Sequence, residues 1–501
     1  MSSRTATIVF LGTLLSILAI VIAWFAGDPL ISTALNQLDH WESTPRQWLQ
    51  APSWPTPYLW LLAIGIVTGL ALLARLAPPS NQWLRALILS VLIGLTLRYV
   101  LWRSCTTLNL SNPLNGVFSL ILLSLELLSI ANILIQLVCQ FQVSDRREEA
   151  AEFAEALMAR EYLPSVDILI PTYNESPFIL RRTILGCQAQ NYGTPHGVTN
   201  GTASGTTTIY LLDDTQRPAM QALAAELGCQ YITRPLNAHA KAGNLNHALP
   251  LTEGELIAVL DADFVPTENF LTATVGFFQD PQIGLVQTPQ CYYNPDPIAL
   301  NLGLTPYCSH EEEVFFRQIQ PVRAGNNAAI CVGTSFIVRR SALLAVGGFV
   351  TDSLTEDYFT GVKLAALGYQ LVYLNQKLSA GLAAENARDH ISQRLRWAQG
   401  NLQAFFIDSN PLTIPGLTLR QRFAHLGGLL HWLAGAGRLG FLLMPLVYLV
   451  LGAIPLRTTL PELVFFFIPY YFAHFALHHW LSIRSRTAIL SDVYSTLLCV
   501  P

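Results

Sequence analysis

Apolar and polar positions alternate along the chain on two different length scales. Six predominantly apolar runs of helix length occur, at about 7–26, 57–77, 82–103, 114–140, 428–452 and 461–482. An α-helix needs about 20 apolar residues to cross the hydrocarbon core of a bilayer. We therefore predict six membrane-spanning helices. The first run could also be read as a signal peptide, but it is long for one and no A-x-A-like cleavage site follows it.

Between the fourth and fifth runs the pattern changes to short apolar segments separated by helix-like ones. The short segments are "VDILIPTYNE", "TIYLLDDT", "CQYITRP", "ELIAVLDADF" and "IGLVQTPQ". Strands that alternate with helices are typical of an α/β domain with a mostly parallel sheet. We predict a Rossmann-like domain of this class inserted in an α-helical transmembrane bundle, with four spans before it and two after it. The Gly- and Thr-rich stretch 192–208 reads as a surface insertion.

Composition and charge agree with this division. Apolar residues make up 51% of the chain and charged residues only 12%, whereas soluble domains carry about 25% charged residues. The predicted regions are an N-terminal transmembrane region (1–140), the α/β domain (145–410), an interfacial helix (411–427), two spans (428–482) and the start of an amphipathic interfacial segment (483–501). A net charge of −4 gives no electrostatic reason to expect nucleic acid as a partner.

The loops between the apolar runs predict the orientation in the membrane. The segment 28–57 carries three acidic residues against one arginine, and 104–113 has no charge, so both read as external. Arg75 and Arg85 flank the short second loop, which the positive-inside rule places in the cytoplasm. The α/β domain is then cytoplasmic, where nucleotide-activated substrates are made. The eight cysteines show no C-x-x-C pair, which fits a reducing compartment.

Polar side chains follow three of the predicted strands at the point where each strand ends. They are Thr172 and Asn174, Asp213 and Asp214, and Asp261 and Asp263. In open α/β sheets, ligands bind outside the carboxyl ends of the strands. We therefore expect these side chains to face one crevice. The sequence has neither a G-x-G-x-x-G dinucleotide fingerprint nor a G-x-x-x-x-G-K-[ST] phosphate loop.

The motif "DAD" at 261–263 is a candidate metal site. In a strand, residues two apart project to the same face, so two carboxylates there would repel unless a cation lay between them. Magnesium usually binds through one or two carboxylates plus substrate phosphates. A structural role in a capped turn is the alternative, because D-x-D alone is a weak signal.

A second acidic pair occurs in "LTEDYFTG", 354–361. Asp357 lies where a helix could begin after Thr355, so a capping cluster is one interpretation. The functional interpretation makes Asp357 a general base within hydrogen-bond reach of an acceptor hydroxyl. Glu356 would then be the neighbour that helps to hold it.

A third candidate is "HISQRLRWAQGN", 390–401. If this segment is helical, Gln393, Arg396, Trp397 and Gly400 fall at i, i+3, i+4 and i+7 on one face. An amide, a guanidinium, an indole and a bare backbone do not form an ordinary core stripe. An interfacial aromatic anchor is the structural alternative for Trp397.

The ordered motifs "PTYNE", "LLDDT", "HAKAGNLNHAL", "DAD", "VGTSFIVRR", "TED" and "QRLRW" resemble those of the processive family 2 glycosyltransferases. Within that family the resemblance is greatest to the UDP-forming catalytic subunits of bacterial and cyanobacterial cellulose synthases. It covers about residues 60 to 490 and implies a glycosyltransferase A-type fold. Each motif alone is weak, but the ordered set is specific.

The resemblance implies a role for each matching position. On the donor side, Asp213 or Asp214 and Asp261 would hold the uridine and ribose, Asp263 would carry Mg²⁺ or Mn²⁺, Lys241 would meet the diphosphate, and Thr172, Tyr173 and Glu175 would line the pocket. On the acceptor side, Asp357 with its neighbour Glu356 would supply the base, Arg396 would stabilise the leaving pyrophosphate, Trp397 and Gln393 would meet the terminal sugar, and Cys331, Gly333 and Thr334 would lie nearby.

These roles imply an inverting transferase that polymerises a β-1,4-glucan from UDP-glucose on the cytoplasmic face of the inner membrane and feeds it into a channel. The implied partners are UDP-glucose, the growing β-glucan, the lipid bilayer and an export subunit in the periplasm or outer membrane. A β-1,3-glucan, chitin or hyaluronan synthase is the alternative enzyme. A non-catalytic membrane partner is the alternative from another class, and the presence of Asp263, Asp357 and Arg396 disfavours it.

Three features depart from the family pattern. Phe264 follows D-x-D where the family often has His, and Thr215 follows Asp214 where the family has Gly. The family also continues through an F-x-V-T-x-K gating loop, two more spans and often a cyclic-di-GMP-binding PilZ domain, whereas this sequence ends at Pro501. We therefore expect a truncated form or an incomplete record of a longer chain.

Ionisable residues inside the predicted spans are functional candidates, because burying charge in a bilayer is costly. They are Arg98, Glu126, His431, Arg438, His474, His478 and His479, which could line a passage for a glycan. For Arg98 and His479 the alternative is that they snorkel or mark the ends of their spans. Glu126 is central in its span, so we expect it to pair with Arg438 or with another helix.

Overall fold

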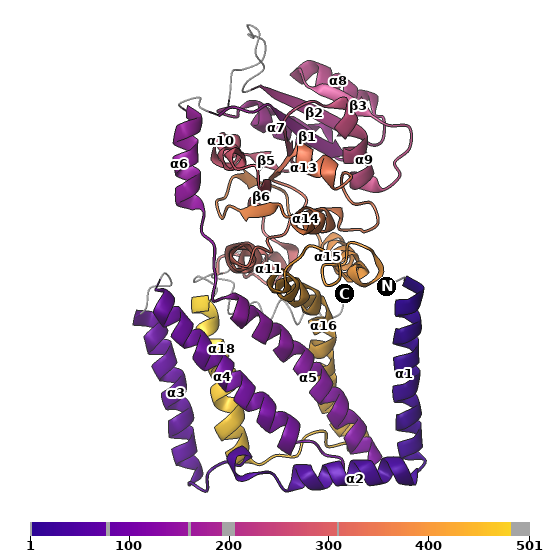
Figure 1. Ribbon diagram of the computed structural model, residues 1–501, viewed down its shortest axis with the longest axis vertical. Coiled ribbons are helices and arrows are strands. Elements are labelled where there is room, and N and C mark those ends of the chain that lie inside the picture. Colours follow the sequence, from indigo (N-terminus) through magenta and orange to yellow (C-terminus); the bar gives the residue numbers. More distant parts are fainter. Residues whose placement is uncertain (1–2, 77–80, 159–161, 193–205, 308–309, 482–501) are drawn as a thin grey trace. The chain divides into compact units, whose positions relative to one another are not determined.

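The computed structural model describes residues 3–76, 81–158, 162–192, 206–307 and 310–481 of the 501. These residues form two compact units, one of residues 1–141 and 426–501 and one of residues 142–425. Figure 1 shows the elements of both. The predicted amphipathic segment 483–501 and most of the predicted insertion 192–208 lie outside the described residues.

The first unit is helical. Its elements are α1 (Ser3–Phe25), α2 (Pro29–Ser43), η1 (Gln47–Leu49), α3 (Thr56–Leu76), α4 (Gln82–Thr106), α5 (Pro113–Cys139), most of α16 (Leu419–Leu451), α17 (Leu460–Glu462), η6 (Leu463–Phe467) and α18 (Ile468–Leu481). Among the described residues, five helices are long and apolar enough to cross a membrane, or six if α1 and α2 count as one bent span. The chain is therefore a membrane protein whose apolar helices come before and after the α/β domain in the sequence.

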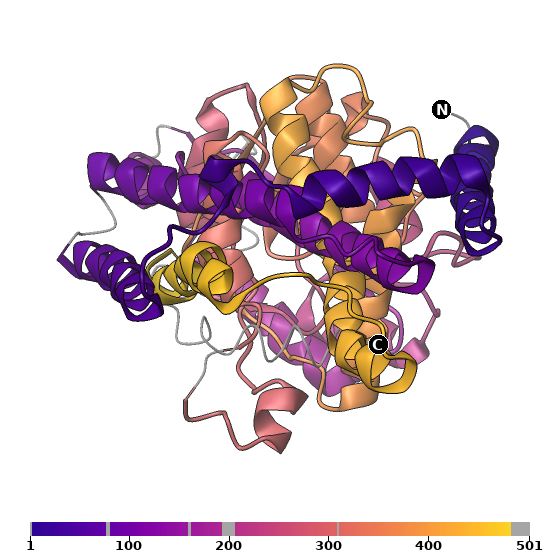
Figure 2. The same cartoon turned by 90° about the horizontal axis from the view of Figure 1, so that it is seen from below.

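Two details of these helices differ from the sequence prediction. The first apolar run ends in an 88° bend between α1 and α2, and Figure 2 shows α2 running across the picture from the end of α1. Asp28 accounts for the bend, because its carboxylate accepts hydrogen bonds from Leu30 N and Ile31 N and caps the new helix. In addition, α16 begins at Leu419 and continues to Leu451 as one helix, where we predicted an interfacial helix followed by a separate span.

Polar residues in the spans pair between helices. The Glu126 carboxylate on α5 accepts a hydrogen bond from Arg103 Nε on α4 at 2.7 Å and a short one from the Tyr99 hydroxyl. Arg103 is almost completely buried, so this ion pair replaces the water that both groups would otherwise require. The partner of Glu126 is thus on another helix, as the sequence allowed. His474 bonds Thr96 of α4 at 2.8 Å.

The second unit is built on a seven-stranded sheet with the strand order β3-β2-β1-β4-β7-β6-β8. Its strands are β1 (Val166–Thr172), β2 (Thr207–Asp213), β3 (Gln230–Thr233), β4 (Leu256–Val259), β6 (Ile283–Gln287), β7 (Phe336–Arg339) and β8 (Gln370–Tyr373), and a small second sheet pairs β5 (Val265–Pro266) with β9 (Ser379–Ala380). Among the described strands of the large sheet, β7 alone runs antiparallel to its neighbours, β4 and β6. The predicted mostly parallel α/β class is confirmed.

Helices and short turns connect these strands. They are α6 (Arg147–Met158), α7 (Pro177–Gln188), α8 (Pro218–Leu227), α9 (Ala240–Ala248), η2 (Leu249–Leu251), α10 (Phe270–Thr274), η3 (Val275–Gln279), α11 (Pro297–Asn301), η4 (Phe315–Ile319), α12 (Gln320–Gly325), α13 (Arg340–Ala345), α14 (Glu356–Ala366), α15 (Ala387–Leu402) and η5 (Gln403–Phe406). Every residue of β1 is buried, which explains its nearly continuous apolar sequence. Its one charged residue, Asp167, therefore needs a partner.

Arg340 is that partner and joins three parts of the sheet. Its guanidinium donates to Asp167 Oδ2 at 2.7 Å, to Gly254 O at 2.5 Å and to Thr252 Oγ1 at 2.8 Å. Asp167 also accepts from Gly254 N at 2.6 Å. This cluster fixes the turn before β4 against β1, and so sets where β4 delivers the acidic residues that follow it.

We expect Arg340→Met to destabilise the protein, because it leaves the Asp167 carboxylate buried without its cation. Breaking a buried pair costs about 3 kcal/mol or more, which lowers the apparent melting temperature of a unit of this size by about 5 °C. Arg181→Met is the matched control, since Arg181 and Glu226 form a pair in which both side chains are exposed and such pairs contribute less than about 1 kcal/mol. Thermal unfolding in detergent measures both. Equal shifts in the two variants would contradict the assigned role of Arg340.

Candidate active site

One edge of the large sheet collects most of the residues singled out in the sequence. Thr172 and Asp213 are register partners at the carboxyl ends of β1 and β2, and Asp261 and Asp263 follow β4. Because β7 is antiparallel, its beginning lies at this same edge, where Phe336 pairs with Val259. The segment that precedes β7, residues 331–335, therefore meets the ends of the parallel strands.

Lys241 forms the centre of the site. Its ammonium donates to Asp261 Oδ1 at 2.5 Å and to Gly333 O at 2.7 Å. Burial alone would lower the pKa of Lys241, but the charges of Asp261, Glu356 and Asp357 outweigh it and raise that pKa above its ordinary value. Lys241 is therefore a fixed positive charge within the working pH range.

Asp357 lies against the same glycine. A Cβ placed on Gly333 would be 2.7 Å from Asp357 Oδ2 and 3.5 Å from Lys241 Nζ. Asp357 Oδ1 accepts a hydrogen bond from Tyr358 N at 2.8 Å in the first turn of α14. Burial, together with the charge of Glu356, raises the pKa of Asp357 to about 7, although Lys241 opposes the shift. A carboxylate with this pKa is suited to accept a proton near neutral pH.

Asp263 is the second carboxylate with a shifted pKa. Burial and the neighbouring charge of Asp261 raise the pKa of Asp263 to about 7, and Lys241 only partly opposes them. Lys241 forms its ion pair with Asp261, and Asp263 forms no ion pair among the described residues. In the same described part of the chain, no cluster of three or more His, Cys, Asp or Glu could by itself hold a metal. The two acidic residues fit a cation that takes its other ligands from a phosphate.

Thr334 and Cys331 belong to the same segment as Gly333. The Thr334 hydroxyl accepts a hydrogen bond from Asp261 N at 2.8 Å, which ties the start of "DAD" to the residue after Gly333. Cys331 is buried, and burial raises the pKa of its thiol well above the ordinary value. Cys331 is therefore a packing residue in its protonated form at neutral pH.

Asp213 and Asp214 are both engaged within the protein. Asp213 is fully buried and accepts hydrogen bonds from Arg217 N at 2.6 Å and from the Tyr231 hydroxyl at 3.0 Å. Asp214 is paired with Arg234, whose guanidinium also donates to Ala238 O and Ala240 O. Their contact with the uridine and ribose stays a prediction, whereas their structural roles are visible.

The Arg234 contacts explain how Lys241 is aimed. The chain enters α9 through His239 and Ala240, whose φ values are 60° and 44°. Residues other than glycine rarely adopt this left-handed region of backbone conformation. Arg234 holds this turn by its backbone oxygens. The Asp214–Arg234 pair thus maintains a strained turn directly before Lys241.

The predicted donor-pocket residues of β1 form a compact loop. Glu175 accepts hydrogen bonds from the Thr172 hydroxyl at 2.7 Å and from Tyr173 N at 2.8 Å. Burial works against these bonds, yet the pKa of Glu175 is lowered overall, so the residue remains charged. Tyr173 is half exposed and its ring is free to cover a ligand at this edge.

The segment of Gln393, Arg396 and Trp397 is helical, in α15, as its spacing suggested. Gly400, at the end of the same face, packs against Thr355, since a Cβ on Gly400 would be 2.6 Å from the Thr355 methyl group. Gln403 extends this contact by accepting from Leu354 N at 2.9 Å. The bare patch of the motif therefore allows α15 to contact the residue immediately before Glu356 and Asp357.

Arg396 is exposed, and it forms no ion pair with the acidic residues that the structure describes. No hydrogen bond joins Gln393 to the carboxylates of the site in the described ranges. The structure thus places Lys241, Asp261, Asp263, Gly333, Glu356 and Asp357 together. It connects the face of Gln393, Arg396 and Trp397 to them through Gly400.

Sequence reasoning missed a buried ionic cluster beside the motif on α15. Arg394, between Gln393 and Arg396, forms ion pairs with Glu311 and Glu312, and Glu312 also accepts from the Tyr292 hydroxyl at 3.3 Å. The available signal was the acidic run "EEE" at 311–313 ahead of an apolar segment. A run of like charges usually indicates a solvated surface, so its burial could not be inferred.

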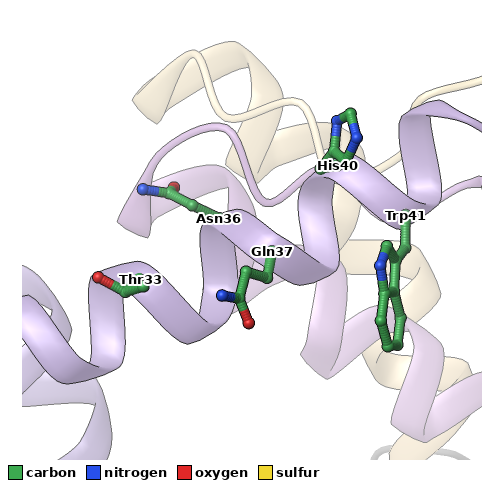
Figure 3. Close-up of a pocket in the computed structure, with 5 residues that line it drawn as sticks. All are labelled: Thr33, Asn36, Gln37, His40 and Trp41. Atoms are coloured by element: carbon green, nitrogen blue, oxygen red, sulfur yellow. The ribbon is translucent and has the colours of Figure 1, made fainter.

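A surface depression of about 340 Å³ lies elsewhere, on α2 of the helical unit. Figure 3 shows its lining residues, Thr33, Asn36, Gln37, His40 and Trp41, all of which project from that one helix. It contains no acidic pair and no lysine. It is therefore not a candidate for the chemistry described above.

Comparison with known proteins adds independent information. Residues 256–482 match the model of Glycosyl transferase family group 2. The chain is 33% identical over 486 residues to the cellulose synthase catalytic subunit [UDP-forming] of Pseudomonas fluorescens (strain SBW25), covering 94% of this chain and 64% of that protein. It is 36% identical over 420 residues to cellulose synthase 2 of Novacetimonas hansenii, covering 83% of this chain and 25% of that protein.

Among solved structures, the chain is similar to the mannosyltransferase PcManGT from Pyrobaculum calidifontis in complex with GDP-Man and Mn²⁺. The similarity has a TM-score of 0.46 with 15% sequence identity, and covers 74% of this chain and 99% of that one.

The conformation of Gly333 gives a direct test of the site geometry. Gly333 and Gly347 both have φ near +86°, but a Cβ on Gly347 would meet nothing within 4 Å. Alanine at either position therefore carries the same backbone strain, about 1 kcal/mol, while only Gly333→Ala also pushes against Asp357. We expect Gly333→Ala to reduce catalytic turnover by at least about tenfold, corresponding to about 1.4 kcal/mol, with Gly347→Ala near wild type. Initial rates normalised to folded protein measure this, and similar rates in the two variants would show that Asp357 does not depend on Gly333.

Proposed function

Because this chain is a family 2 glycosyltransferase, we propose that it polymerises a β-1,4-glucan from UDP-glucose and couples the polymer to the membrane helices of the same chain. The observation that supports this most directly is the arrangement of Lys241, Asp261 and Asp357 around Gly333. That arrangement combines one cation for a diphosphate, an acidic pair for a metal and a carboxylate with a pKa near neutrality.

On the donor side, the residues fit a divalent cation. Asp263, with Asp261 beside it, offers the oxygen ligands that Mg²⁺ or Mn²⁺ prefers, and burial together with the charge of Asp261 raises the pKa of Asp263. When bound, such an ion would neutralise the diphosphate of the donor. Lys241 would contact the same diphosphate from its position between Asp261 and Gly333.

The transfer step follows from the single basic group. The acceptor hydroxyl attacks C1 of glucose, the bond from C1 to the phosphate oxygen breaks, UDP leaves with the bonding electrons, and the hydroxyl proton passes to Asp357. No covalent bond to the protein forms, so the configuration at C1 inverts and an α-linked donor yields a β linkage. Arg396 would stabilise the negative charge that develops on the leaving diphosphate.

On the acceptor side, Trp397 would stack against the terminal sugar of the growing glucan, with Gln393 beside it. The catalytic unit would face the cytoplasm of a bacterial cell and the helices would lie in the inner membrane, where the glucan enters. Relatives named cellulose synthase support the choice of substrate. An export subunit beyond the membrane is part of the proposal.

We expect membranes containing this chain to convert labelled UDP-glucose into insoluble product only with Mg²⁺ or Mn²⁺ present. EDTA should abolish incorporation, and a β-1,4-specific glucanase should destroy the product. Asp357→Asn should lose at least about 99% of the incorporation, since it removes the base, while UDP binding measured by calorimetry stays intact. Asp352→Asn is the matched control, because Asp352 is an exposed carboxylate of the same segment.

Changing the donor sugar and removing the metal-binding carboxylate distinguish the proposed function from its alternatives. Product from UDP-N-acetylglucosamine, or product resistant to the glucanase, would reassign the enzyme to another β-glycan synthase. Asp263→Asn should remove the metal-dependent part of UDP binding, which is measured without turnover. If the folded protein binds UDP but transfers sugar from none of the donors, the remaining interpretation is that the chain is a non-catalytic membrane partner.

The pH dependence should identify the base. With saturating metal, which keeps Asp263 charged, kcat/KM should fall about tenfold per unit as the pH drops below about 7, because Asp357 becomes protonated. Glu356 raises the pKa of Asp357 but is not among the causes that shift Asp263. Glu356→Gln should therefore move the acidic limb of the pH profile of kcat/KM to lower pH. A limb that stays in place in Glu356→Gln would assign it to a group other than Asp357.

A further inference from the structure

One turn before Trp397, α15 contributes to a buried ionic cluster that the transfer step does not use. It consists of Tyr292, Glu311, Glu312, His390 and Arg394, and is called the α15 anchor below. Arg394 pairs with both glutamates, at 3.1 Å from its Nη2 to Glu312 Oε1 and closer still to Glu311. His390 Nε2 lies 3.3 Å from Glu311 Oε1. The two glutamates are no more than 10% exposed, so these charges depend on one another rather than on water.

Arg394 also contacts the tryptophan of the acceptor motif. Its guanidinium carbon lies 4.9 Å from the centre of the Trp397 ring, which is cation–π geometry. One turn of the helix separates the two residues, so the contact fixes the indole against the helix. One face of the Trp397 ring is thereby covered, so a sugar that stacks on Trp397 would use the opposite face.

The α15 anchor extends to the donor side of the site. The Tyr292 ring packs edge-on against Phe264, the residue after Asp263, with ring centres 5.7 Å apart. The Tyr292 hydroxyl bonds Gln290, whose amide donates to Val332 O directly before Gly333. Phe264, which departs from the family pattern, is thus the apolar contact through which the anchor meets the "DAD" segment.

We propose that Arg394 is a positioning residue that sets the orientation of Trp397, and with it the placement of the acceptor sugar, by tying the indole to the Glu311–Glu312 pair. This inference rests on the proposed function, because it takes Trp397 as the acceptor platform. Arginine suits the task, since its planar guanidinium can pair with two carboxylates and stack on an aromatic ring at once.

The test compares transfer to the glucan with transfer to water. In Arg394→Met the acceptor is misplaced while the donor site is intact, so incorporation into polymer should fall between about ten- and a hundredfold. The KM for UDP-glucose should stay within about twofold of wild type. The ratio of free glucose to polymer should rise, because water replaces the misplaced acceptor. Arg394→Lys, which keeps the charge but not the planar fork, should recover part of the loss.

Two comparisons exclude a general effect on folding. Arg181→Met removes an exposed arginine–glutamate pair on α7 and α8 and should leave the glucose-to-polymer ratio unchanged. In a Trp397→Ala background, Arg394→Met should have little further effect, since its route to the acceptor is already lost. Additive losses in the double variant, or an equal decrease of polymer and free glucose in Arg394→Met, would overturn the proposal.

A readout without turnover separates this inference from the proposed function. In protein labelled with 5-fluorotryptophan, the ¹⁹F resonance absent from Trp397→Phe is that of Trp397. Arg394→Met should shift it and Arg181→Met should not. A shift in protein that transfers no sugar would contradict the proposed function and retain the positioning role, whereas an unshifted resonance would reject the positioning role in either case.

Discussion

The site is governed by an imbalance of charge around a single glycine. Asp261, Glu356 and Asp357 all act electrostatically on Lys241, which forms its ion pair with Asp261, and the charge of Asp261 also acts on Asp263. Two of the carboxylates respond with a pKa near 7, because full ionisation of the group would place like charges in a poorly hydrated volume. Such a site favours a ligand that places positive charge beside the carboxylates. In a metal–diphosphate donor, the metal ion would supply that charge and the diphosphate would contact Lys241.

The rest of the catalytic unit can be read as support for this arrangement. Because β7 runs antiparallel, the backbone before it reaches the ends of the parallel strands and places Gly333 O on Lys241. The Asp214–Arg234 pair maintains the strained entry to α9 from which Lys241 projects. On the opposite side, Gly400 lets α15 approach Thr355, which fixes the first turn of α14. These contacts together fix the positions of the groups around Asp357.

The sequence predicted the sheet well where one physical signal dominated. Buried parallel strands read as apolar runs that end in polar residues, so β1, β2, β4 and β6 and the acidic edge could be located before the structure. It did not predict that β7 is antiparallel, since strand direction depends on long-range pairing. Nor did it separate Asp213 and Asp214, which the protein itself satisfies, from Asp263, which forms no ion pair in the part of the chain that the structure describes. Hydrogen-bond satisfaction is a property of the folded chain, and residue spacing does not encode it.

Helix α15 shows why the intervening positions of a motif can matter. Gln393, Arg396 and Trp397 form the recognisable pattern, yet it is Arg394, between Gln393 and Arg396 in the sequence, that forms ion pairs with Glu311 and Glu312. Burying these charges requires desolvation that an apolar contact would avoid, so stability alone is a weak reason for the cluster. Directional hydrogen bonds and a planar cation fix orientation in a way that apolar packing does not. An acceptor platform that must return to the same position after every added sugar has a use for that directionality.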